Sequence, residues 1–334
     1  MKSKLISALK YAIGLSIAGG LLWYVFKDWN LEDLIERFSQ VNYWWILLSV
    51  ILSVISHVIR AYRWNLLLHP LGYNNLTTFR TFLAVMVGYI TNLFAPRAGE
   101  IARCGVLKRT DNVNMSASIG SVVAERIIDF LGLLVIIFFG LLLQFDLLSG
   151  FLKDFFFEKS KSIKLSDGTI EFLIAFGLVI VIVLATLWIL RARIKRLPLY
   201  YKLRSFANEM ADGFTSVLKL QNKSGFWIST LLIWVLYYTM AYVVIFAMPS
   251  TSHLGLLAGL SILIMGGLGM SAPVQGGFGT YHILVGSVLS LYGVAQKDGY
   301  FFATLIHTSQ TLTVLIVGSI SFMLSLRIKK KELN

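Results

Sequence analysis

The sequence predicts an all-α polytopic membrane protein with six full transmembrane helices and two re-entrant helical hairpins of opposite sidedness. Of the 334 residues, 57% are hydrophobic and only 14% are charged, which gives more apolar surface than one soluble core of this size can bury. Apolar runs of about 20 residues, the length that crosses a bilayer as a helix, recur along the chain. We therefore expect one transmembrane domain over residues 1–334 and no separate soluble domain.

Six apolar runs are long enough to cross a membrane. They cover residues 5–26, 43–67, 115–144, 169–190, 225–247 and 298–326. The first follows Lys2, Lys4 and Lys10 and resembles a secretory signal, but no small-residue cleavage site follows it. We therefore interpret residues 5–26 as a span and keep a cleaved signal as the alternative.

Basic residues are concentrated in one long connection, and lysine and arginine favour cytoplasmic loops. That connection contains Arg191, Arg193, Lys195, Arg196, Lys202, Arg204, Lys219 and Lys223. Basic residues also occur at 2–10 and 327–331, so both termini are expected on the cytoplasmic side of the cytoplasmic (inner) membrane. The net charge of +13 then contacts anionic lipid headgroups, and we expect no nucleic-acid partner.

Two further apolar segments are interrupted by proline and glycine. Residues 79–109 break at APRAG (95–99), and residues 255–292 break at APVQGG (272–277). If 79–109 crossed once, the basic connection would lie outside, so each segment should enter and leave by one face. Two broken segments of opposite orientation are typical of inverted-repeat transporters, whose site lies where the tips meet. Two tilted full spans in each segment preserve the same parity and remain an alternative.

Charged residues inside the predicted spans are candidates for function, because a charge at the bilayer centre costs about 2.5–3.5 kcal/mol. Glu125 and Asp129 are four residues apart and share one helix face. They serve either as structural ion-pair partners or in transport. Arg60 and Arg63 follow one face of the second span, where they either reach headgroups or bind a lipid phosphate through the guanidinium fork.

The first hairpin tip combines Arg97, Glu100 and Arg103 with the start of a new helix, which attracts anions. Glu100 can neutralise an arginine when no ligand is bound. We predict that these three side chains share a polar cavity with Glu125 or Asp129. A structural turn held by an Arg–Glu pair is the alternative.

The second tip contains Gln275, Gly276 and Gly277 and carries no formal charge. Its glycines permit close backbone approach, either to a substrate or to another helix. We expect it to contribute to the substrate site and to gate the outer side.

Four motifs in this order resemble the lysylphosphatidylglycerol synthase transmembrane family. They are RAYRW (60–64), APRAGEIAR (95–103), ERIIDF (125–130) and PVQGGFGTYH (273–282). The resemblance implies a flippase-like domain that translocates aminoacylated phosphatidylglycerol, a related anionic lipid or a polyprenyl-phosphate-linked lipid. The 334 residues lack the soluble synthase domain of the fused members, so we expect no enzyme activity and no cofactor or metal. Membrane lipids with a phosphate-bearing headgroup are the expected partners.

Two enzyme hypotheses compete with transport. A lipid-linked glycosyltransferase, or another membrane enzyme acting on a lipid phosphate, is the first, although the sequence has no Asp-x-Asp motif. An intramembrane serine hydrolase using Ser271 with His282 or His307 is the second. The single cysteine, Cys104, excludes a disulfide framework within the chain.

Overall fold

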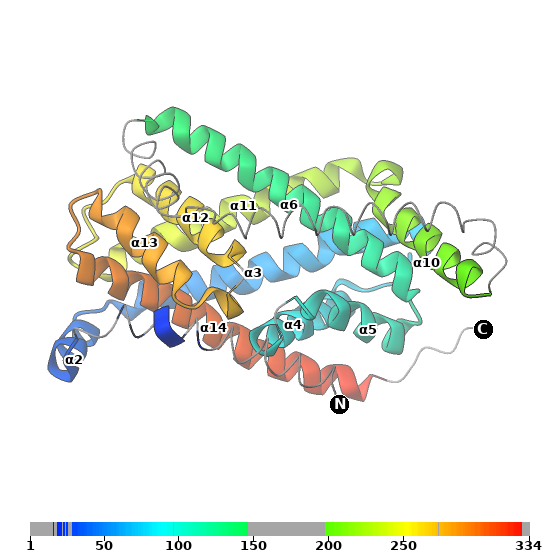
Figure 1. Ribbon diagram of the computed structural model, residues 1–334, viewed down its shortest axis with the longest axis horizontal. Coiled ribbons are helices and arrows are strands. Elements are labelled where there is room, and N and C mark those ends of the chain that lie inside the picture. The colour runs from blue at the N-terminus through cyan, green and yellow to red at the C-terminus, as the bar shows by residue number, and fades with distance from the viewer. Residues whose placement is uncertain are drawn as a thin grey trace, which may run out of the picture.

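A computed structural model describes residues 16, 19–21, 23, 25, 29–95, 97–145, 198–272 and 274–328 (Figure 1). All regular structure within these residues is helical, which confirms the all-α class. The predicted span at 169–190 and most of the span at 5–26 lie outside the described residues.

Four long helices form the framework of the bundle. They are α3 (Tyr43–Leu68), α6 (Met115–Leu143), α11 (Lys223–Val244) and α14 (Gln296–Arg327). Each is long and apolar enough to cross a membrane, as predicted for residues 43–67, 115–144, 225–247 and 298–326. The shortest of them, α11 with 22 residues, is about 33 Å long, close to the thickness of the hydrocarbon core.

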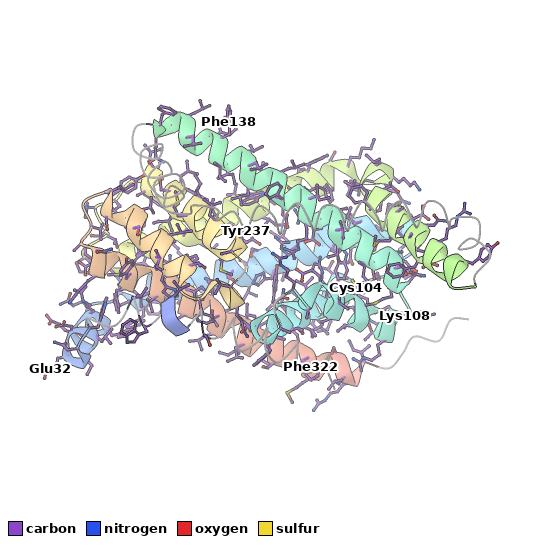
Figure 2. All side chains as sticks on the ribbon, in the orientation of Figure 1. Glu32, Cys104, Lys108, Phe138, Tyr237 and Phe322 are labelled. Carbon is purple, nitrogen blue, oxygen red and sulfur yellow. The ribbon has the colours of Figure 1, made fainter. Side chains whose placement is uncertain are left out.

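The outer surface of the bundle is apolar. Phe138 on α6 and Phe322 on α14 lie at its edges, where they are 58% and 49% exposed (Figure 2). Cys104, by contrast, is fully buried. Exposed apolar side chains along helices of this length are stable against lipid but not against water, so the chain is an integral membrane protein.

Two helices outside the four-helix framework identify the ends of the bundle. The helix α2 (Leu31–Ser39) lies at one end, where Arg37 pairs with Asp298 at the start of α14. The helix α10 (Pro198–Thr215) lies at the other end and packs on α6 (Figure 1). Gly120 and Gly213 permit this contact, since a Cβ on either would lie 1.9 Å from a carbonyl oxygen of the facing helix. We refer to these as the α2 end and the α10 end.

The helices α4 (Thr78–Phe94) and α5 (Gly99–Asp111) form an antiparallel pair. Arg80 pairs with Asp111 where the two helices meet at the α10 end. At the inner tip, Gly99 N–H donates to Asn92 Oδ1 over 2.7 Å. With 17 and 13 residues, the helices are about 25 and 20 Å long, which is shorter than the hydrocarbon core.

The helices α12 (Leu256–Ser271) and α13 (Thr280–Ser290) form a second pair that starts at the α2 end. At that end Ser261 Oγ lies 2.8 Å from the hydroxyl of Tyr292. The short 3-10 helix η6 (Gln275–Gly277) forms the inner tip. The amide of Gln275 donates to the carbonyl oxygens of Leu93 (2.8 Å) and Phe94 (3.2 Å), so the tips of the two pairs meet within the bundle.

Candidate functional site

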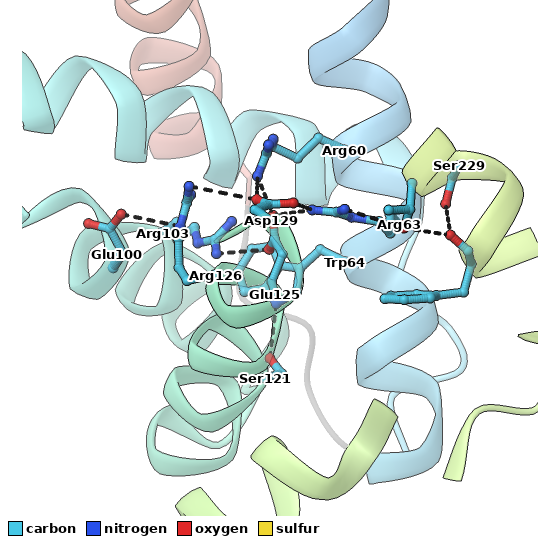
Figure 3. Close-up of polar contacts among 12 residues, drawn as sticks. Arg60, Arg63, Trp64, Glu100, Arg103, Ser121, Glu125, Arg126, Asp129 and Ser229 are labelled. Atoms are coloured by element: carbon cyan, nitrogen blue, oxygen red, sulfur yellow. Dashed lines mark hydrogen bonds and ion pairs between the residues drawn. The ribbon is translucent and has the colours of Figure 1, made fainter. Parts of the chain in front are cut away.

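Charged side chains from three helices meet inside the bundle (Figure 3). The set, called here the charge cluster, consists of Arg60 and Arg63 on α3, Arg103 on α5, and Glu125 and Asp129 on α6. The side chains of Arg63 and Glu125 have no exposed surface, and that of Asp129 is 15% exposed. A charged group so far from water is stable only with close partners.

The two carboxylates of α6 bind the arginines directly. Glu125 accepts hydrogen bonds from Arg60 (2.6 Å), Arg63 (3.2 Å) and Arg103 (2.9 Å). Asp129 accepts from Arg60 (2.7 Å) and Arg63 (2.6 Å). The four-residue spacing of the acids and the three-residue spacing of the α3 arginines therefore place facing pairs on two helices.

Neutral side chains that the sequence analysis missed complete the cluster. Arg60 donates to the hydroxyl of Tyr237 (2.9 Å), and Arg63 lies 3.4 Å from the hydroxyl of Thr230. Both partners are on α11, seven residues and thus two turns apart, so they share one face. The seven-residue spacing of these two polar residues in an apolar span is the sequence signal that could have identified them.

The third arginine rests on an aromatic surface. The guanidinium carbon of Arg103 lies 4.4 Å from the ring centroid of Trp64, which allows a cation–π interaction. The indole N–H of Trp64 donates to Ser121 Oγ over 3.0 Å. Arg103 is therefore oriented by one carboxylate and one ring.

The charge cluster has an excess of positive charge, because three guanidinium groups face two carboxylates. Within the described residues, the buried Nε–H groups of Arg60, Arg63 and Arg103 have no hydrogen-bond partner. Unused donors and one uncompensated positive charge favour an anion at this site.

Glu100 pairs with an arginine outside the predicted set. Its Oε1 lies 3.5 Å from Nε of Arg126, whose Nη1 is 3.9 Å from Asp129. Glu100, Arg103 and Arg126 are among the residues that line a small cavity of about 10 Å³. The predicted shared polar cavity is thus occupied by direct ion pairs, since buried charges of opposite sign approach each other when the helices permit it.

Arg97 lies apart from the charge cluster. Its φ of 64° is in the left-handed region that residues other than glycine seldom adopt, and its side chain is exposed. Arg97 is not among the residues that line the small cavity beside Arg103, and a role for Arg97 in substrate binding stays a prediction. Arg97 is exposed, whereas Arg103 is buried.

The second tip is held by packing and hydrogen bonds. Besides the bonds of Gln275 to α4, the carbonyl oxygen of Gly276 accepts from His307 Nε2 over 2.8 Å. Gly276 (φ 58°) and Gly277 (φ 70°) both adopt the left-handed conformation that glycine tolerates best. Binding of substrate by these residues stays a prediction.

Within the described ranges, no three His, Cys, Asp or Glu side chains gather in a way that could hold a metal ion. The arrangement of the described residues is an apolar helical bundle around buried arginines and carboxylates. These features define a polytopic membrane protein with a charged interior.

The chain belongs to the lysylphosphatidylglycerol synthase TM region family, whose pattern matches residues 11–318. It is 25% identical over 303 residues to the Glycosyltransferase AglD of Haloferax volcanii, which covers 84% of this chain and 48% of that protein. It is also 28% identical over 104 residues to a UPF0104 membrane protein of Methanocaldococcus jannaschii, which covers 30% of each chain. The chain thus spans about half of the first relative and a smaller part of the second. No solved structure matches it.

Proposed function

We propose that this protein moves a phosphate-bearing lipid between the two leaflets of a cytoplasmic membrane. The cargo class includes aminoacylated phosphatidylglycerol, related anionic lipids and polyprenyl-phosphate-linked lipids. The family membership supports a lipid-related role, because lysylphosphatidylglycerol is itself such a lipid. The observation that carries the proposal is the charge cluster, with its excess arginine and unused buried donors.

The topology we propose has six crossings and two re-entrant hairpins. The long helices α3, α6, α11 and α14 supply four crossings, and residues 5–26 and 169–190 supply the other two. The pairs α4–α5 and α12–α13 are the hairpins. Each pair starts and ends at the same end of the bundle, and each of its helices is shorter than a membrane span. Their contact through Gln275 fits tips that meet near mid-membrane.

The α10 end faces the cytoplasm in this proposal, together with both termini. Its described charged residues are mostly basic: Arg80, Lys108, Arg109, Arg204, Lys219, Lys223 and Arg327, against Asp111, Glu209 and Asp212. This bias agrees with the preference of lysine and arginine for cytoplasmic loops. Labelling of single cysteines in α10 by an impermeant reagent from outside intact cells would contradict this orientation.

In this proposal the lipid headgroup crosses the protein by replacing one ion-pair partner of the arginines with another. Hydrocarbon chains stay in the bilayer, while a charged headgroup needs a polar route across it. Arg60, Arg63 and Arg103 bind the phosphate in place of Glu125 and Asp129, which reclaim the arginines when the anion leaves. Arg97 and the second tip are the next polar groups toward the α2 end.

Leaflet exchange in reconstituted liposomes tests the proposal. Wild-type protein should accelerate exchange of a labelled anionic or aminoacylated lipid, and Arg103→Lys should slow it about tenfold because lysine lacks the bidentate fork. The matched control is Arg109→Lys, since Arg109 lies on the same helix but bonds Ser325 outside the charge cluster. Equal exchange in wild-type and empty liposomes, over a panel that includes polyprenyl phosphates, would refute transport.

A glycosyltransferase is the second candidate, because one relative of the chain bears that name. Since the chain spans 48% of that relative, the name alone does not transfer the activity. Hydrolysis of a sugar nucleotide by the purified protein would favour this candidate over transport.

A further inference from the structure

A groove of about 280 Å³ lies between α5 and α6 on the surface of the bundle. Apolar side chains line it: Ile101 from α5, and Ile119, Val123, Ile127 and Phe130 from α6. Four of these, all except Ile119, are 41–59% exposed. Because α6 is a membrane-spanning helix, the groove opens toward the hydrocarbon of the bilayer and suits a lipid chain.

A charged pair borders the same groove. Arg126 and Glu100 line it together, and their side chains are 40% and 30% exposed. The contact between them is long at 3.5 Å, and Nε of Arg126 makes no hydrogen bond within the described residues. A cationic side chain that is 40% exposed and borders an apolar groove in a membrane complements a ligand that combines a hydrocarbon chain with an anion.

The depth of Arg126 distinguishes this groove from an ordinary lipid-facing surface. Arg126 is eleven residues beyond Met115, the first residue of α6, or about 17 Å along the helix axis. Arg126 therefore lies nearer to the middle of this 29-residue helix than to its first residue. Arg126 also lies 3.9 Å from Asp129, which bonds Arg60 in the charge cluster. The groove and the charge cluster are therefore connected through one carboxylate.

We propose that the α5–α6 groove is a lateral docking site for an anionic phospholipid. One acyl chain occupies the apolar groove, and the phosphate binds Arg126 in place of Glu100. Glu100 is a competing anion that closes the site when no lipid is bound. This inference rests on the proposed function, since the docked phosphate then passes by way of Asp129 to Arg60 and Arg103.

Photo-crosslinking of the full chain in nanodiscs tests the docking site. The probes are phosphatidylglycerol and phosphatidylcholine that carry the same diazirine-labelled acyl chain. We expect phosphatidylglycerol to label residues 99–130 about fivefold more than phosphatidylcholine, the ratio that one partly exposed charge-assisted hydrogen bond supplies. Equal labelling by the two lipids in wild-type protein would overturn the inference without requiring any variant to fold.

Paired substitutions separate the headgroup contact from the chain contact. Arg126→Gln should abolish the preference for phosphatidylglycerol, whereas Lys108→Gln, which removes a charge from exposed α5 surface, should retain it. Val123→Trp should fill the groove and lower labelling by both lipids. Val135→Trp, at an exposed valine of α6 outside the groove, should not. A retained preference in Arg126→Gln would also overturn the inference.

The leaflet-exchange assay distinguishes failure of the docking site from failure of the proposed function. Preferential labelling of the groove in a protein that does not accelerate exchange would support the docking site and refute transport. Accelerated exchange without preferential labelling at residues 99–130 would refute the docking site and support transport by another route.

Discussion

The two helical pairs whose tips meet inside the bundle differ sharply in chemistry. The α4–α5 pair contains Arg80, Arg97, Glu100, Arg103, Lys108, Arg109 and Asp111, whereas α12–α13 contains no Asp, Glu, Lys or Arg. The first pair contributes Arg103 to the charge cluster. The second is fixed by glycine contacts such as that of Gly269 with Tyr281. Two pairs of similar shape therefore differ in content: one carries charged side chains, and the other is uncharged and closely packed.

The largest expected effect is the loss of the central carboxylate. Glu125→Gln leaves three buried arginines with one carboxylate, which should lower the free energy of unfolding by about 3–5 kcal/mol. Thermal unfolding in detergent measures the effect. Glu100→Gln, which alters only the long contact with half-exposed Arg126, is the matched control and should change stability little. Similar melting temperatures for the two variants would show that the charge cluster is not buried as described.

A smaller loss is expected from the glycine packing of the second pair. A Cβ on Gly269 would lie 2.7 Å from the Cα of Tyr281, so Gly269→Ala should destabilise the protein by about 1–3 kcal/mol through overpacking. A Cβ on Gly105 of α5 would have no neighbour within 4 Å, so Gly105→Ala should be neutral or stabilising. Equal melting temperatures for Gly269→Ala and Gly105→Ala would show that tight packing around glycine does not distinguish the second pair from the first.

The smallest effect concerns the contact between the tips. Gln275→Leu removes the donor to the carbonyl oxygens of Leu93 and Phe94, at an expected cost of about 0.5–1.5 kcal/mol. Hydrogen exchange should become faster at residues 91–95 and stay unchanged at the outer ends of α4 and α5. The control is Gln296→Leu, which removes a bond to Tyr300 at the α2 end. Unchanged exchange at the tip in Gln275→Leu would show that the tips do not stabilise each other.

The length of the hydrophobic runs was enough to predict the long helices from the sequence. The four described spans match their predicted ranges closely, because an apolar run of the length of α6 has few stable states except a helix in lipid. Glu125 and Asp129 were predicted to share a face for an equally local reason, since residues four apart on a helix always do. Both features depend only on neighbours in the chain.

Which charges meet was decided by the tertiary structure. Residues Arg60 and Glu125 are far apart in sequence, and only the packing of α3 against α6 brings them within 2.6 Å. The position of α11 brings Tyr237 into contact with Arg60 of the charge cluster, whereas Arg97, in a left-handed turn, is exposed. Periodicity fixes the face on which a side chain lies, but the partner of a buried charge depends on how helices distant in the chain pack together.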